Sequence, residues 1–165
     1  MTWKIVIAGG NLSFSAAHFI TLNGTYEPLH GHNYGVSAEL VGDDLTTDSY
    51  LLDFGVVKAM LRGYISEVNH RFLLPLHNSF LHLKRSADER EWTIRLGDGA
   101  RMVLPAASVV TLPFDNATAE RLAEWFAGRM QTDLAARDIH NVRRITVGVS
   151  ETEMQTAFCT IDLLS

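Results

Sequence analysis

The sequence predicts an α+β fold in which an antiparallel sheet carries two helices on one face. Two observations support this prediction. Segments that alternate between apolar and polar residues come in pairs, and two segments with helical spacing stand between those pairs. The resulting order is strand, strand, helix, hairpin, helix, strand, strand. Because strands and helices do not alternate one by one, paired antiparallel strands are favoured over a parallel sheet.

The first two strands are expected within residues 3–19 and 32–42. Gly9 and Gly10 interrupt the first segment, which indicates a bulge or a bend. The second segment alternates, so every other side chain points the same way. One face of this strand and of the residues just before it carries His30, His32, Tyr34, Val36, Ala38 and Leu40.

Two helices are expected, the first over 54–68 and the second over about 118–134. Asp53 stands where an N-cap residue would accept hydrogen bonds from the first turn of the first helix. Both segments keep apolar residues three and four positions apart, which places those residues on one helix face.

The remaining elements are a hairpin and two closing strands. Residues 76–113 form a less regular insertion, in which a Gly-Asp-Gly turn between two alternating runs predicts a hairpin around 91–104. The closing strands lie in RRITVGVSE and TAFCTIDLL. Their apolar faces carry Ile145, Val147, Val149 and Glu151 in the first, and Ala157, Cys159, Ile161 and Leu163 in the second.

The composition indicates one globular domain spanning residues 1–165. Apolar residues make up 47% of the chain and charged residues 20%. The net charge of −5 argues against a nucleic-acid partner, which usually needs a basic surface. Cys159 is the single cysteine, so no internal disulfide can form and a reducing cytoplasm is expected. No apolar run reaches the length of a membrane span, and we expect no signal peptide.

Three histidines have the spacing of a metal site. His30 and His32 share one strand face a few ångströms apart, and His18 ends the preceding strand, which can return beside them. Three imidazoles without a fourth protein ligand are typical of a catalytic zinc site with one open position. Imidazole also suits copper, nickel and iron. The pair of histidines alone is a common pattern that need not bind a metal.

Two further features fit an ordinary structural role as well. Glu151 continues an apolar stripe, where a carboxylate is costly unless something pairs with it, but it could simply mark a strand end that emerges into solvent. Asn69 and His70 follow the first helix, where a protonated histidine is favourable. Read as plain sequence, this is an ordinary helix stop.

Taken together, these segments resemble the 6-pyruvoyl-tetrahydropterin synthase and 6-carboxytetrahydropterin synthase family. The matching pieces occur in the family's order and cover most of the chain outside 76–113. They are FSAAH, LHGHNY, LLDFGVVKAML, VNHRFL, NATAERLAEWF and VGVSETE. The resemblance implies the tunnelling fold (T-fold), with a four-stranded antiparallel sheet and two helices. It also implies that subunits join edge to edge into a barrel, as a homohexamer made of two trimers.

The resemblance also implies roles for particular residues. It implies that zinc is bound by His18, His30 and His32, and that a pterin ring is held by Glu151, with Thr152 and Thr118 nearby. The implied reaction changes the side chain of 7,8-dihydroneopterin triphosphate or a related pterin. The product could be 6-carboxytetrahydropterin, 6-pyruvoyl-tetrahydropterin or 6-hydroxymethyl-dihydropterin, and the pathway could be queuosine, folate or biopterin synthesis.

The chain departs from the family pattern at two positions. Glu27 stands near the place of the usual catalytic cysteine, as in a branch that cleaves the side chain to 6-hydroxymethyl-dihydropterin. Glu27 is therefore the expected general base, with His70 as its partner. Asn69 replaces the usual aspartate, so it can orient His70 but cannot supply a negative charge. These departures leave an alternative, a pterin- or purine-binding member that has lost or changed the reaction.

Overall fold

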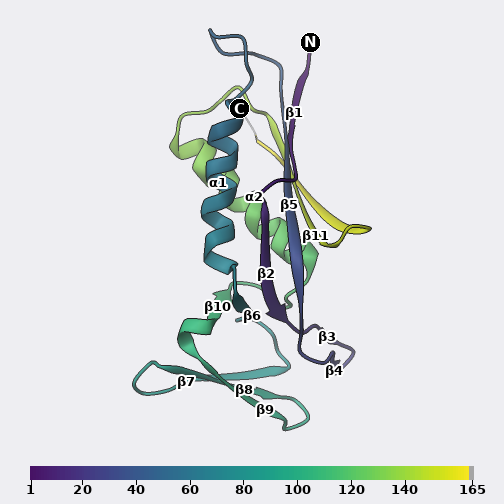
Figure 1. Cartoon of the computed structure of the whole chain (residues 1–165), viewed down its shortest axis with the longest axis vertical. Coiled ribbons are helices and arrows are strands. Elements are labelled where there is room, and N and C mark those ends of the chain that lie inside the picture. The colour runs from purple at the N-terminus through teal and green to yellow at the C-terminus, as the bar shows by residue number, and fades with distance from the viewer. Residues whose placement is uncertain (164–165) are drawn as a thin grey trace. The chain divides into compact units, whose positions relative to one another are not determined.

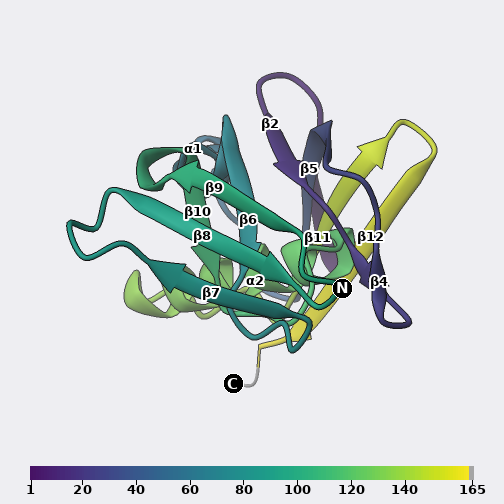
Figure 2. The same ribbon diagram turned by 90° about the horizontal axis from the view of Figure 1, so that it is seen from below.

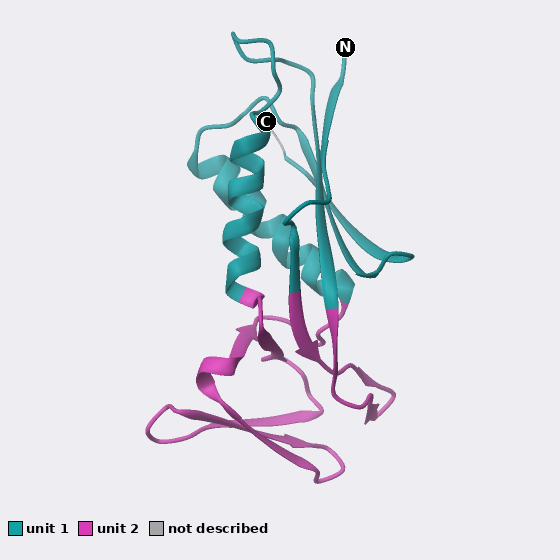
Figure 3. Cartoon of the chain, in the orientation of Figure 1, with its two compact units in different colours: residues 1–14, 33–67, 119–165 teal, residues 15–32, 68–118 magenta. Residues whose placement is uncertain are grey.

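The computed structural model describes residues 1–163 and divides into two compact units. Unit 1 comprises residues 1–14, 33–67 and 119 onward, and unit 2 comprises residues 15–32 and 68–118 (Figure 3). The predicted last strand includes Leu164, which lies outside the described residues. Unit 2 contains the predicted insertion as well as the three histidines.

Unit 1 contains the predicted four-stranded antiparallel sheet, in the order β1–β5–β11–β12 (Figure 1). Its strands are β1 (Trp3–Ile7), β5 (His30–Gly42, of which residues 30–32 belong to unit 2), β11 (Arg144–Thr152) and β12 (Gln155–Asp162). The apolar faces of β5 and β11 are buried, as the alternation predicts. The fold class is therefore confirmed.

The two predicted helices are α1 (Phe54–Val68) and α2 (Ala119–Ala136). Asp53 caps α1, since its Oδ1 accepts hydrogen bonds from the backbone N–H groups of Gly55 (2.5 Å) and Val56 (3.3 Å). Aromatic rings connect the sheet to both helices. The ring centroids lie 4.7 Å apart for Phe14 and Tyr34, 6.0 Å for Phe14 and Phe126, and 6.3 Å for Tyr64 and Phe126.

The glycine pair does interrupt the first predicted strand. The chain forms β1 and then β2 (Ser13–His18), with a turn between them in which Gly9 (φ 74°) and Gly10 (φ 63°) have left-handed backbones. Glycine reaches this conformation without the steric cost of a Cβ atom. The turn separates the strand at the edge of the unit 1 sheet from the strand that carries His18.

Unit 2 contains parallel strand pairs that the sequence does not predict. β6 (Arg71–Pro75) pairs in parallel with β2 and with β10 (Val109–Leu112). β6 is almost entirely buried and so lacks the alternation that marks a half-exposed strand. A short hairpin of β3 (Thr21–Leu22) and β4 (Thr25–Tyr26) follows β2.

The predicted hairpin is β8 (Glu91–Leu96) and β9 (Arg101–Pro105), and β7 (Leu81–Arg85) adds a third antiparallel strand. A short 3₁₀ helix, Ala106–Ser108, joins β9 to β10. One face of this small sheet packs on a core that includes Phe19, Phe72, Leu74, Leu81, Ile94, Leu96 and Val109. Among the described residues, neither helix is long and apolar enough to cross a membrane.

Candidate metal centre

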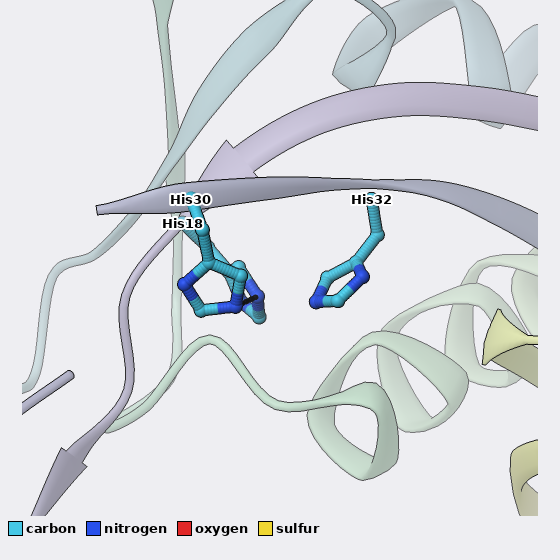
Figure 4. Close-up of side chains that lie close together, drawn as sticks. All are labelled: His18, His30 and His32. Carbon is cyan, nitrogen blue, oxygen red and sulfur yellow. Dashed lines mark hydrogen bonds between the residues drawn. The ribbon is translucent and has the colours of Figure 1, made fainter. Parts of the chain in front are cut away.

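The three predicted histidines converge in unit 2. His18 ends β2, while His30 and His32 begin β5, and their rings point into one space (Figure 4). One ring nitrogen from each lies within 4.8 Å of the others, a spacing that a single metal ion could bridge. His18 is fully buried, and the other two imidazoles are half-buried. The cluster could therefore bind a metal ion.

Backbone carbonyl groups orient two of these imidazoles. Nδ1 of His18 lies 2.8 Å from the carbonyl oxygen of Ala117, and Nδ1 of His30 lies 2.8 Å from that of Pro28. Because a carbonyl oxygen only accepts, each Nδ1 must carry the proton and each neutral ring presents its Nε2 lone pair. This is the usual arrangement around metal-bound histidines, in which a second group fixes the tautomer.

The two Nε2 atoms of this pair lie 3.2 Å apart. When both rings are neutral and carry their protons on Nδ1, the two Nε2 lone pairs face each other across this gap. A cation at this point would turn that repulsion into two favourable bonds. The donor set and its orientation therefore fit a divalent transition metal.

Gly31 explains how two histidines can begin β5 beside β2. A Cβ atom added at Gly31 would lie 2.9 Å from the backbone carbonyl oxygen of Ala16. Real Cβ atoms do not approach backbone so closely, so only glycine allows this strand contact. The glycine between His30 and His32 thus lets β5 approach the strand that supplies His18.

Asn69 and His70 fasten the start of β2. The side-chain Oδ1 of Asn69 accepts a hydrogen bond from the backbone N–H of Ser15 (3.0 Å), and the His70 N–H donates to the Ser15 carbonyl oxygen (2.6 Å). His70 has a left-handed backbone (φ 58°) and an exposed side chain. The Asn69 side chain therefore serves the backbone of a neighbouring strand, and its action on the His70 imidazole stays a prediction.

Glu27 directly follows the β3–β4 hairpin and is an exposed residue. Its backbone N–H donates to the carbonyl oxygen of Ile20 (2.9 Å), which fixes the base of the loop leading to His30. Thr118 is half-buried and directly follows Ala117, the residue whose carbonyl orients His18. Both residues belong to unit 2.

Glu151 lies near the end of β11 in unit 1, and one of its carboxylate oxygens is buried without a hydrogen-bond partner. Such an atom is costly unless a donor reaches it. Burial, and then the nearby Glu151 carboxylate, raise the pKa of the Tyr34 phenol. Thr152 is the last residue of β11, and its Oγ1 accepts a hydrogen bond from the Met154 N–H in the following turn (3.3 Å).

Cys159 is unsuited to replace the missing cysteine. It is half-buried on β12, where burial, and then Glu124, raise the pKa of its thiol. A nucleophilic or proton-transferring cysteine needs the opposite shift. Its position in the half-buried stripe of the last strand agrees with a structural role.

A family model described as 6-pyruvoyl tetrahydropterin synthase matches residues 10–162, and the chain belongs to this family. Its members are lyases that act on pterin side chains, and this protein is such an enzyme. The resemblance seen in the sequence is thus confirmed.

Individual relatives agree with this family. A Methanocaldococcus jannaschii protein with the provisional name 6-carboxy-5,6,7,8-tetrahydropterin synthase is 27% identical over 141 residues, which is 85% of this chain and 84% of that protein. Dihydroneopterin monophosphate aldolase of Pyrococcus furiosus is 36% identical over 61 residues, covering 37% and 51% of the two chains.

The 6-pyruvoyltetrahydropterin synthase of Plasmodium vivax has a similar structure, with a TM-score of 0.92 and 25% identity over 99% of both chains. The segment 76–113 therefore has a counterpart in that enzyme. Variants of it, in which a catalytic glutamate is replaced by alanine or by cysteine, match equally well.

The trihistidine geometry predicts that His32→Ala will lose most of the bound metal. Two remaining imidazoles hold a divalent ion poorly, so elemental analysis should fall from about one ion per chain to a small fraction. His82→Ala, which removes an exposed histidine of β7, is the matched control and should keep the metal. Full metal retention in the His32→Ala protein would show that the cluster is not the metal site.

Proposed function

We propose that this protein is a zinc-dependent lyase acting on the side chain of 7,8-dihydroneopterin triphosphate or a closely related pterin. The observation that carries this proposal is the trihistidine cluster, in which the Nδ1 atoms of His18 and His30 face backbone carbonyls and which Glu27 precedes in the chain. Three imidazoles without a fourth protein ligand favour zinc among the available metals. When bound, zinc would act as a Lewis acid toward oxygens of the pterin side chain.

Glu27 is the proposed general base. It lies three residues before His30, on a loop held by the hydrogen bond from its own N–H to Ile20. From that position its carboxylate would accept a proton from the substrate side chain, and His70 would act as the partner acid or base. The Plasmodium vivax enzyme supports this role, since a glutamate is a catalytic residue there.

Glu151 is the proposed anchor of the pterin ring. A carboxylate can accept two parallel hydrogen bonds from the guanidine-like edge of a pterin, and such charge-assisted pairs are stronger than neutral ones. The buried oxygen without a partner is the observation that supports this role. Thr152 and Thr118 are the accompanying contacts that the family resemblance suggests.

The proposed product rests on Glu27, which stands near the place of the family's usual catalytic cysteine. A glutamate there favours cleavage of the side chain to 6-hydroxymethyl-dihydropterin over formation of 6-carboxytetrahydropterin or 6-pyruvoyl-tetrahydropterin. The similarity to the dihydroneopterin monophosphate aldolase of Pyrococcus furiosus is in line with such a carbon–carbon cleavage. Other relatives are named 6-carboxy-tetrahydropterin synthase, so 6-carboxytetrahydropterin is the alternative product that the assay has to distinguish.

A second candidate is a pterin- or purine-binding protein without turnover. The observation that favours it is the Asn69 side chain, whose oxygen is engaged by the Ser15 backbone. Asn69 therefore supplies neither a charge nor an evident contact for a proton relay through His70. Incubation with dihydroneopterin triphosphate and chromatography of the mixture separates the two candidates, because only the lyase forms a new pterin.

Glu27→Gln should keep zinc and pterin binding but lose turnover by about 10²-fold or more, because the amide cannot accept the proton. Turnover of dihydroneopterin triphosphate, followed by chromatography of the products, measures the effect. Glu153→Gln, which changes an exposed glutamate in the β11–β12 turn, is the control and should turn over normally. If the Glu27→Gln enzyme matches the wild type, Glu27 is not the base.

Glu151→Gln should weaken pterin binding by roughly 2 kcal/mol or more while zinc stays in place. The amide presents its own N–H₂ group to one of two ligand donors, which leaves a buried donor unmatched. A fluorescence titration with a pterin product analogue gives the affinity, and elemental analysis of the same sample gives the zinc content. Unchanged affinity would mean that Glu151 only marks the end of β11.

The proposed assembly is a homohexamer of two trimers. β12 pairs only with β11 among the described strands, and Phe158 on β12 is 65% exposed. An open edge with an exposed aromatic residue is suited to pairing with another subunit. Light scattering should give about six times the 18.3 kDa chain mass, and Phe158→Asp should lower it. A stable wild-type monomer at micromolar concentration would contradict the assembly.

A further inference from the structure

A row of basic side chains, two arginines and a histidine, crosses the exposed face of the three-stranded sheet β7–β8–β9. Figure 2 shows these strands side by side. In the antiparallel register His82 lies opposite Arg95, and Arg95 lies opposite Arg101. We call His82, Arg95 and Arg101 the cationic row. Lys84 extends it on the same face of β7, and all four side chains are exposed.

No carboxylate within the described residues 1–163 neutralises this row. Its side chains make no ion pair or hydrogen bond there, whereas other arginines are paired, such as Arg129 with Glu67 (2.7 Å) and Arg143 with Asp43 (3.0 Å). Even Arg85 at the end of β7 hydrogen-bonds to the Glu89 carbonyl oxygen. What distinguishes the cationic row is its register, which places Arg95 of β8 directly opposite Arg101 of β9.

The acidic residues of this hairpin are placed where they do not neutralise the row. Glu91 shares the face but stands four residues along β8 from Arg95, which is about 13 Å in a strand. Asp98 lies in the β8–β9 turn, where its Oδ1 accepts from the Ala100 N–H (2.9 Å). Like charges directly opposite on antiparallel strands destabilise a sheet. An anion lying across the row would relieve that repulsion.

The dimensions and chemistry of the face favour one kind of anion. Neighbouring strands are about 4.8 Å apart, so the long side chains of adjacent strands can converge on successive phosphates of one linear polyphosphate. Guanidinium groups bind phosphate oxygens through two parallel hydrogen bonds. The face has no phenylalanine, tyrosine or tryptophan on which bases could stack. Val103, on the edge strand β9, is an exposed apolar residue of this face, and the face also lacks the aromatic anchors of protein interfaces.

We propose that the cationic row binds a linear triphosphate group carried by a small molecule. Arg95 lies at the middle of the row and contacts the central phosphate, while Arg101 and His82 contact the ends. This site consists of residues in the 76–113 segment, and the proposal does not depend on the metal chemistry or on Glu27.

Inorganic tripolyphosphate is the probe, measured by isothermal titration with the full-length protein at low ionic strength. We expect the wild type to bind it more tightly than orthophosphate or sulfate at matched ionic strength. Arg95→Gln/Arg101→Gln should bind about tenfold or more weakly, since two charge-assisted contacts are lost. Arg62→Gln on α1, which removes an exposed arginine elsewhere, should leave the affinity unchanged.

Two further proteins separate binding at the cationic row from a loss of fold and from binding at the metal centre. Arg95→Lys/Arg101→Lys keeps the charge and should retain more affinity than the glutamine variant. Because tripolyphosphate can also reach a metal, His32→Ala should still bind it through the row, and adding the two glutamine substitutions should abolish that binding. Thermal melting should show the glutamine variant folded, with a midpoint equal to or above that of the wild type, because a repulsion is removed.

The proposal is overturned if the wild type does not bind tripolyphosphate, or if the glutamine variant binds it equally well. It is also overturned if a single-stranded oligonucleotide or an oligoglutamate peptide binds the wild type more tightly and loses its affinity in the glutamine variant. In that case the face would serve a macromolecule.

Discussion

The hydrogen bonds from imidazole Nδ1 atoms to backbone carbonyls are the constraint on which the candidate site depends. Each bond sets the tautomer of one ring and so directs its Nε2 lone pair. For His18 the acceptor is Ala117, which lies 99 residues away along the chain. The segment before α2 therefore has to follow its native path before His18 can adopt its orientation. Folding of unit 2 and formation of the candidate metal site are thus coupled.

Close backbone contacts hold the strands that carry these histidines in place. Gly31 lets β5 approach β2, and Asn69 and His70 fix the first residues of β2 through Ser15. The parallel pairing of β6 with β2 and β10 adds a rigid support on the other side of β2. Residues that the family resemblance links to catalysis thus also have structural duties. A variant at Asn69 or Gly31 would alter the ligand positions before it altered any proton transfer.

The sequence predicted most of the regular elements, because their patterns are local. The structure confirms three such local predictions: the N-cap Asp53 before α1, the alternation of β5, and the hairpin around the Gly-Asp-Gly turn. β6 was missed because a short, almost fully buried strand has no alternation, and β10 was missed because four residues are too few to show a period. The three histidines could be grouped from spacing alone. The acceptors Ala117 and Pro28 could not be predicted, because every residue has a backbone carbonyl and the residue type does not show which carbonyl accepts a hydrogen bond.

The use of backbone oxygens has a consequence for how this site tolerates genetic change. A single substitution can remove a side-chain partner, but every residue at position 117 has a backbone carbonyl. A substitution there can remove this acceptor only by moving the chain. The orientation of His18 is therefore buffered against point mutation at its partner. Its vulnerability lies in insertions and deletions between β10 and α2, which would shift the register of the acceptor. Drift along that segment should accordingly be strict in its length, and it is also limited by the buried residues Phe114 and Ala117 and by the Asn116 side chain, which hydrogen-bonds to Thr21.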